Sequence, residues 1–191
     1  TAALSDLDTS GLLGHVRFLL TDTSYSSESF PLTVNVSAAH VPSPSATITI
    51  KPIPGVTTSI SGDAGGDPIF RIKTNYVTID GSNATGGTSR DMTIRNTGSF
   101  SPIAVNVTSM DTISVHDAVV KNCILINTAH DNSSVVVGGQ GYFFPGPFSA
   151  VTIENNEIRG GGTGIYINGG FSYAAQGRNV TVRSNLLNGS G

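Results

Sequence analysis

The sequence predicts an all-β protein, a right-handed single-stranded parallel β-helix with an irregular N-terminal cap. Short runs in which apolar and polar residues alternate recur along the chain, and this period of two is typical of strands rather than helices. Four of these runs begin at positions 92, 118, 151 and 180, and this nearly regular recurrence indicates stacked structural repeats. The segments between the runs are rich in glycine and asparagine, which favour tight turns.

Each of the four runs supplies two apolar residues that we expect to point into the solenoid. The runs are Met92–Asn96, Ala118–Cys123, Val151–Asn156 and Val180–Asn185. The expected inward pairs are Met92 and Ile94, Ala118 and Val120, Val151 and Ile153, and Val180 and Val182. A turn column is expected to follow them at Thr97, Cys123, Asn156 and Asn185. Stacked amides there satisfy backbone groups of the turn, and Asn156 over Asn185 is the best candidate pair.

A second family of strands shares this period. Its members are Ile69–Ile72, Ile103–Val107, Ser134–Val137 and Gly164–Ile167. The run Val77–Gly81 also resembles a repeat strand, but it begins too shortly before Met92 for a full coil to fit between them, and its sheet is left unassigned.

Residues 1–60 are less regular than the rest of the chain and are predicted to form a capping segment together with the first strands. A short helix is expected between Ser5 and Gly14, followed by strands at His15–Leu20, Leu32–Val36 and Thr47–Ile50. Residues 61–191 are predicted to form the coils of the helix. We expect these coils to continue beyond Gly191, because no cap follows the last repeat.

The composition argues against several classes of partner. The 191 residues are 38% hydrophobic and only 12% charged, with a net charge of -3, so no basic surface for nucleic acid or an acidic membrane is expected. No run approaches the roughly 18 apolar residues that span a bilayer, so membrane insertion is not predicted. Cys123 is the only cysteine and is expected to be a buried, unreactive thiol.

No catalytic set and no metal site are predicted. The outward charged residues Asp80, Arg95, Lys121, Glu154 and Arg183 alternate in sign and are best explained as ion pairs between coils. The four histidines lack metal-ligand spacing, and His116 with Asp117 is interpreted as a surface pair. No cofactor is predicted. Calcium has the only candidate ligands, Asp63 with Asp67 or Asp80 with Asn83, and turn-forming side chains are the plainer interpretation of these.

Seven of the thirteen phenylalanine and tyrosine residues fall between positions 142 and 173 and form the candidate binding site. They are Tyr142, Phe143, Phe144, Phe148, Tyr166, Phe171 and Tyr173. Tyr166 lies between two inward isoleucines, so its ring should point outward, and the others fall in two long insertions of consecutive coils. An exposed cluster would stack on sugar rings or anchor a protein. The alternative is that Phe143, Phe144 and Phe148 fold back over the sheet.

An outward threonine column is also expected, at Thr78, Thr93, Thr152 and Thr181 with Thr49 extending it. Regular threonine arrays on flat β-helices bind ice. Here the neighbouring positions are charged and Val119 interrupts the column, so a solvated ladder of residues with high strand propensity is the better explanation.

Four segments carry a likeness to a known group of proteins: His15–Tyr25, Phe30–Val34, Tyr76–Ser82 and Thr88–Ile94. Together with the later asparagine-containing strands, they resemble the right-handed β-helix regions of large secreted and cell-surface proteins of the Bacteroidota, within the pectate-lyase-like solenoids. The resemblance implies export, often by the type IX route, and a place inside a multi-domain protein. It implies no particular activity, because such solenoids include adhesins, carbohydrate-active proteins and spacers.

Three functions are therefore carried forward. The main hypothesis is a non-catalytic secreted or cell-surface β-helix, acting as a stalk or adhesin segment that binds a polysaccharide or cell-surface glycan through its aromatic insertions. The first alternative is a β-helix polysaccharide lyase or glycoside hydrolase, which requires converging carboxylates or calcium. The second is a subunit of an extracellular fibre, in which the open C-terminal end contacts further coils or neighbouring subunits.

Overall fold

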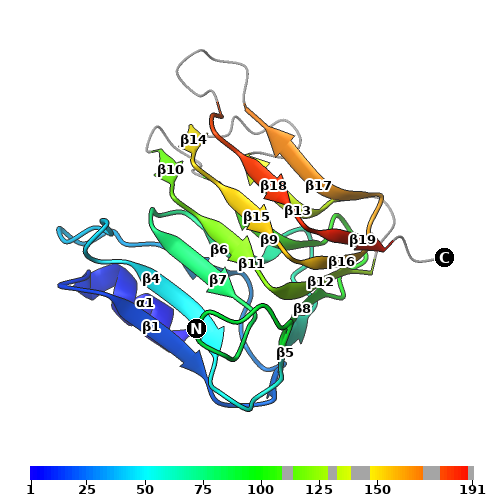
Figure 1. Cartoon of the computed structure of the whole chain (residues 1–191), viewed down its shortest axis with the longest axis horizontal. Coiled ribbons are helices and arrows are strands. Elements are labelled where there is room, and N and C mark those ends of the chain that lie inside the picture. Colours follow the sequence, from blue (N-terminus) through cyan, green and yellow to red (C-terminus); the bar gives the residue numbers. More distant parts are fainter. Residues whose placement is uncertain (109–113, 129–132, 139–146, 170–176, 189–191) are drawn as a thin grey trace.

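The computed structural model describes residues 1–108, 114–128, 133–138, 147–169 and 177–188. In these residues the chain forms a parallel β-solenoid, in which each coil adds one strand to each of three parallel sheets (Figure 1). The predicted all-β parallel β-helix is thereby confirmed. Sheets A, B and C are named in the order in which each coil visits them.

Strands one coil apart pair in register in every sheet. Sheet A contains β1 (Val16–Leu20), β4 (Ile48–Pro52), β7 (Val77–Asp80), β11 (Val119–Lys121), β15 (Thr152–Glu154) and β18 (Thr181–Arg183). Sheet B contains β2 (Ser24–Tyr25), β5 (Thr58–Gly62), β8 (Met92–Asn96), β12 (Cys123–Asn127), β16 (Glu157–Gly160) and β19 (Leu186–Asn188). Sheet C contains β3 (Leu32–Val34), β6 (Pro68–Ile72), β9 (Ile103–Val107), β13 (Ser133–Gly138) and β17 (Thr163–Asn168). A short pair, β10 (Val115–His116) and β14 (Phe148–Ser149), precedes sheet A in two coils.

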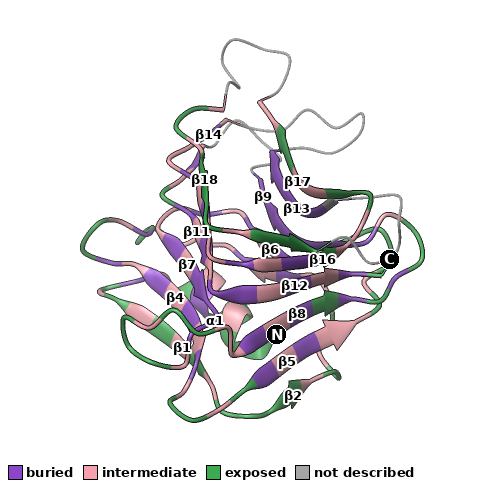
Figure 2. Cartoon of the chain, turned by 45° about the vertical axis from the view of Figure 1, so that its right-hand side comes forward, coloured by how far each residue is buried: buried purple, intermediate pink, exposed green. Residues whose placement is uncertain are grey.

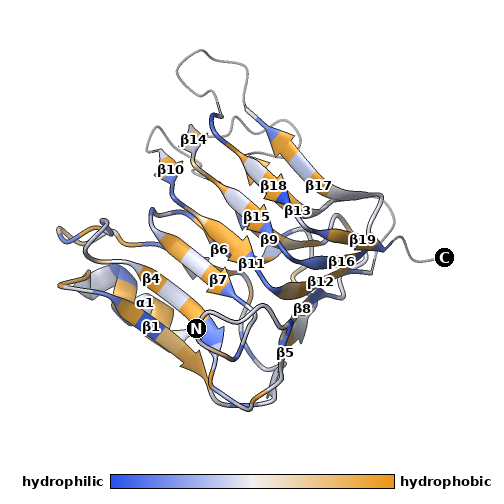
Figure 3. Cartoon of the chain, viewed as in Figure 1, coloured by the Kyte–Doolittle hydropathy of each residue, from blue (hydrophilic) through white to orange (hydrophobic). Residues whose placement is uncertain are grey.

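The core is built from columns of apolar side chains that stack from coil to coil. In sheet A one column runs through Ile50, Ile79, Val120 and Ile153, all buried, and ends at Val182. Apolar and polar residues alternate across the strands of this sheet, as Figure 3 shows. Because successive side chains of a strand point to opposite faces, this alternation places one apolar row inside the solenoid and one polar row outside.

The two ends of the solenoid differ (Figure 2). At the N-terminal end, helix α1 (Ala2–Ser10) packs against β3 and buries Leu7. The helix begins and ends earlier than the short helix expected between Ser5 and Gly14. In the described part of the chain no helix is long and apolar enough to cross a membrane. At the other end, the last coil leaves Val182 47% and Leu187 62% exposed.

The prediction that Met92–Asn96 lies in the same sheet as the runs beginning at Ala118, Val151 and Val180 is wrong. Met92–Asn96 is a strand of sheet B, whereas Val77–Asp80 occupies the corresponding place in sheet A, with Thr78 paired to Val119. The two strands belong to one coil and lie in different sheets. The chain between them therefore has to turn only one corner, and no full coil has to fit there. As a result Thr93 and Arg95 face outward from sheet B and not from sheet A.

A residue in the left-handed conformation, asparagine in two coils and serine in the third, sets the corner between sheets A and B in the later coils. Asn122, Asn155 and Ser184 separate the strands of the two sheets by a single turn, and their φ angles are 57°, 51° and 56°. Asparagine tolerates this left-handed conformation better than most residues because its short side chain bonds locally. In the preceding coil Gly81 takes this place, where a β-carbon would lie 1.9 Å from the Asn122 carbonyl oxygen.

Candidate functional site

Of the aromatic candidates, the structure describes Phe148 and Tyr166. Tyr142, Phe143, Phe144, Phe171 and Tyr173 lie outside the described residues. Tyr166 is 38% exposed on β17, paired with Val136 of the coil before it. Phe148 is 1% exposed, and its ring fills the space beside Gly177 and Gly138. Phe148 is therefore a core residue, and Tyr166 is the described aromatic candidate with an exposed side chain.

The outward charges of sheet A form a column across the coils. Asp80, Lys121, Glu154 and Arg183 stand in register on consecutive strands. The Lys121 ammonium lies 3.7 Å from the Asp80 carboxylate, and the Arg183 guanidinium lies 2.5 Å from that of Glu154. These contacts are the ion pairs between coils that the sequence predicts. Arg95, also expected in this column, lies in sheet B instead. The ion pairs leave the carboxylates of this face engaged with the solenoid itself.

The threonine column lies beside these charges. Thr49, Thr78, Val119, Thr152 and Thr181 are in register along sheet A. Thr93 is absent from it because β8 belongs to sheet B, where Thr93 pairs with Ser59 and Ile124. The face of sheet A is thus a flat polar surface of threonine and paired charges.

Inside the corner between sheets A and B, buried amides stack as predicted. The Asn156 amide donates to the Asn185 side-chain oxygen over 3.0 Å, which confirms the expected pair, and to the Val120 carbonyl oxygen over 2.9 Å. Its own oxygen accepts the Cys123 backbone N–H over 3.0 Å. The column contains Met92, Cys123, Asn156 and Asn185 and not Thr97.

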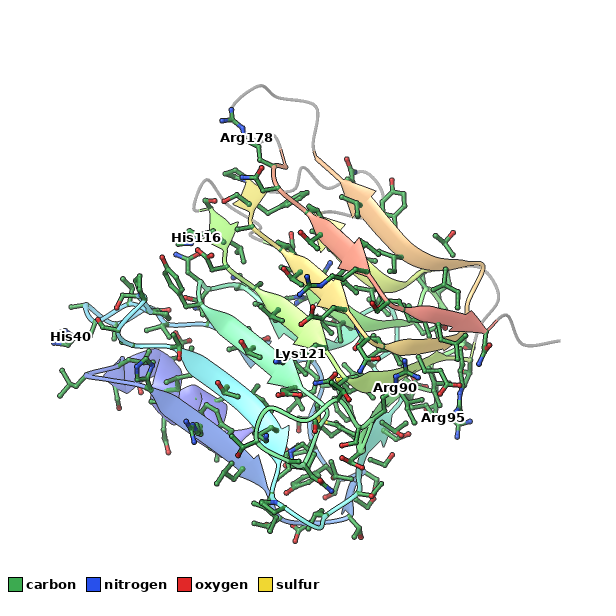
Figure 4. All side chains as sticks on the ribbon, viewed as in Figure 1. His40, Arg90, Arg95, His116, Lys121 and Arg178 are labelled. Carbon is green, nitrogen blue, oxygen red and sulfur yellow. The ribbon has the colours of Figure 1, made fainter. Side chains whose placement is uncertain are left out.

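Sequence reasoning missed a strap that crosses this corner from the outside. The segment 82–91, inserted between β7 and β8, reaches two coils along the solenoid (Figure 4). Arg90 donates to the backbone oxygen of Asn155 over 2.8 Å and to its side-chain oxygen over 3.0 Å. The Asn155 amide donates to Thr88 over 2.8 Å and to the Asn122 side chain over 2.7 Å. Contacts between residues so far apart in the chain leave no periodic signal in a sequence.

At the opposite edge of sheet A, His116 and Asp117 form the predicted surface pair. The His116 Nδ1 lies 2.7 Å from the Asp117 carboxylate, and the Tyr76 ring meets the imidazole edge-on at 5.0 Å between centroids. The His116 backbone N–H donates to the Asn75 side chain over 2.9 Å. The cluster is partly exposed and is held in place by contacts within its own coil and with the coil before it.

On sheet B, the Glu157 carboxylate accepts hydrogen bonds from two side chains. Arg159 donates to it over 2.7 Å and Asn188 over 2.9 Å. The hydrogen bond from Arg159 lowers the pKa of Glu157 below its usual value, and the same contact raises the pKa of Arg159. Glu157 is therefore ionised at neutral pH and fixed by two neighbours.

The calcium candidates have structural roles in the structure. The Asp63 carboxylate accepts the Gly65 N–H over 2.7 Å, and Asp67 pairs with Arg71 at 2.5 Å. The Asp80 carboxylate accepts the Ser82 N–H over 3.0 Å. Among the described residues, no group of three or more histidine, cysteine or acidic side chains is arranged to hold a metal ion.

Cys123 is fully buried and its thiol is not an active nucleophile. Burial, and then the charge of Asp80, raise the pKa of Cys123 well above its usual value. The thiolate that a nucleophile needs is therefore not populated in the folded protein at neutral pH.

Comparisons of the chain with protein-family models, with curated proteins and with solved structures give no match. The case for function therefore depends on the sequence pattern and on the site geometry.

Proposed function

We propose that this chain is a non-catalytic β-helix segment of an exported or cell-surface protein, where it acts as a stalk or adhesive segment and binds carbohydrate. The observation that carries the proposal is the continuity of the stacking. Apolar columns, amide ladders and ion pairs all run from coil to coil, so the outward polar groups of sheet A mainly stabilise the solenoid. Such a body resists bending because every coil is hydrogen-bonded to the next along its length.

Carbohydrate binding is supported by the position of Tyr166. Its ring stands on the outer face of β17, in the coil bounded by the two long insertions of the sequence, and is 38% exposed. A tyrosine ring combines a flat apolar face with a polar hydroxyl, which suits stacking on a sugar ring. The export route and the kinship with Bacteroidota surface proteins belong to the same proposal and are supported by the sequence resemblance.

A glycan array on the purified chain tests the binding. We expect binding of one glycan class, weakened about fivefold or more in Tyr166→Ala, because one aromatic stacking contact contributes about 1 kcal/mol or more. Phe100→Ala is the matched control, since Phe100 is an aromatic residue 76% exposed on the turn between sheets B and C. Equal loss in both variants, or no glycan bound by the parent chain, would remove carbohydrate binding from the proposal.

The enzyme alternative has its own test. A lyase or hydrolase needs carboxylates free to meet a sugar, and those of Asp80, Glu154 and Glu157 each bond to a neighbouring side chain of the solenoid. We expect no turnover on plant, algal or bacterial polysaccharides. Product formation that one carboxylate substitution abolishes would overturn the non-catalytic proposal.

The fibre alternative is favoured by one observation, the exposed apolar surface of the last described coil. Val182, Leu186 and Leu187 of that coil, and Ile167 of the coil before it, are each at least 44% exposed. End-to-end association would bury them and pair the open strand edges. Concentration-dependent polymers in electron micrographs, lost in Leu187→Lys, would support a fibre subunit, and a monomer at all concentrations would count against it.

A further inference from the structure

A cavity of about 220 Å³ lies between helix α1 and the first coil of the solenoid. Leu4 lines it from the helix, Phe18 and Leu20 from β1, and Ile50, Ile60 and Phe70 from the second coil. In Figure 1 this is the N-terminal end of the solenoid, drawn in blue.

The cavity exists because the cap is smaller than the end that it covers. A helix of nine residues is about 13 Å long, whereas a single five-residue strand already extends about 16 Å. The helix packs on the sheet C side, against β3, and the inward residues Phe18 and Leu20 of β1 stay half-buried. Their partners in the next coil, Ile50 and Pro52, are buried.

The polar groups of the described lining residues are already engaged with one another or with the backbone. The Tyr25 hydroxyl accepts the backbone N–H of Thr21 over 3.0 Å and that of Asp22 over 3.2 Å. The Glu28 carboxylate at the rim is 2.5 Å from the Thr1 ammonium, and this contact lowers the pKa of Glu28, so the two charges neutralise each other. Water needs two to four polar partners to be held in a cavity, and these walls supply few.

We infer that this cavity binds a small uncharged apolar molecule of roughly nine non-hydrogen atoms, such as a medium-chain aliphatic alcohol. The size follows from comparison, because an apolar cavity of about 150 Å³ holds one benzene molecule. The absence of charge follows from the lining, which is mostly apolar and whose one carboxylate, Glu28, is already paired, so an ionic group placed in the cavity would lose its hydration without gaining a partner. This site is independent of the carbohydrate proposal, which concerns the outer face of sheet C.

Titration of the isotope-labelled chain with n-octanol, followed by nuclear magnetic resonance, tests the inference. We expect saturable shifts confined to the lining residues, and at least about tenfold weaker binding of octanoate at pH 7. Leu4→Trp and Ala3→Phe each add a ring at the helix side of the cavity and should weaken octanol binding by about tenfold or more. Leu187→Trp adds the same ring at the opposite end of the solenoid, and binding should stay within about twofold of the parent.

Three results would overturn the inference. Shifts that never saturate, or that spread over the whole chain, would mean non-specific partition of the alcohol. Octanol binding that survives in both folded filling variants would place the site elsewhere. Octanoate bound as tightly as octanol would contradict the uncharged class of ligand. Ala3 is exposed in the parent, so Ala3→Phe decides the matter should Leu4→Trp fail to fold.

Discussion

Removing the side chain of Asn156 should destabilise the solenoid more than removing that of Asn185, although the two amides stack on each other. Asn156 is fully buried, whereas Asn185 lies one coil further along the solenoid and is half-buried. Both occupy the same column inside the corner between sheets A and B. Burial is therefore the main difference between the two substitutions.

The expected magnitude follows from the bonds that Asn156 makes. Asn156→Ala removes three side-chain hydrogen bonds, to Val120, Cys123 and Asn185. A neutral hydrogen bond contributes about 1 kcal/mol, and a buried group left without a partner costs about 1 to 3 kcal/mol more. The Cys123 N–H would be such a group. We therefore expect a loss of about 4 to 6 kcal/mol in the free energy of unfolding, against about 1 kcal/mol for Asn185→Ala, where water replaces the amide.

Urea unfolding monitored by circular dichroism measures both losses. Hydrogen exchange of the Cys123 amide locates the effect, because this N–H loses its acceptor in Asn156→Ala but keeps it in Asn185→Ala. Asn156→Asp adds a check through pH. One oxygen of the new carboxylate would face the oxygens of Val120 and Asn185. The variant protein should therefore become more stable as the pH falls and that oxygen gains a proton.

The reasoning would be refuted if Asn156→Ala and Asn185→Ala lost equal amounts of stability. A loss below about 1 kcal/mol in Asn156→Ala would likewise show that the column relaxes around the missing amide. If unfolding proceeds in more than one transition, as coils separate independently, exchange at Cys123 remains the deciding measurement.

Three further changes probe other parts of the solenoid. Gly81→Ala should cost about 3 kcal/mol or more in thermal or urea unfolding, because its β-carbon would lie 1.9 Å from a backbone oxygen; Gly14→Ala, with open space around it, should cost less than about 1 kcal/mol. The Cys123 thiol should react with a maleimide at pH 7 only as fast as the protein unfolds, and rapid labelling of the folded chain would contradict its burial. The lowered pKa of Glu157 means that its ionised form adds stability above its usual pKa of 4.5 and loses it as the pH falls below that value, so Glu157→Gln should flatten the acid side of the stability profile.

The strand alternation and the asparagine signal were sufficient to predict the fold and one specific contact. The runs Ala118–Cys123, Val151–Asn156 and Val180–Asn185 each contain a strand of sheet A, and Asn156 bonds Asn185 as expected. The misplaced strand has a clear cause. Val77–Thr78–Ile79 and Met92–Thr93–Ile94 have the same alternation, and a period of two identifies a strand without identifying its sheet.

The strap and the cavity could not be predicted from the sequence for different reasons. Arg90 bonds Asn155 through an irregular insertion, which has no period to read. The cavity depends on where a short amphipathic helix comes to rest on the end of the first coil, and only the packing of α1 against β3 determines that position. Periodic sequence patterns describe the repeated part of a solenoid, whereas its insertions and ends depend on contacts that occur once.

The placement of the insertions also indicates which surface of the solenoid we expect to bind a ligand. In the later coils the corner between sheets A and B is short. One residue separates β11 from β12, and two residues separate β15 from β16 and β18 from β19. The polar groups of this corner are used by the ladder of Asn122 and Asn155. The connection from sheet C back to sheet A varies instead. It covers only positions 73–76 between β6 and β7, but positions 169–180 between β17 and β18. Since the solenoid tolerates added length at this edge, the coil surfaces beside it, including Tyr166, are where ligand specificity can vary without disturbing the core.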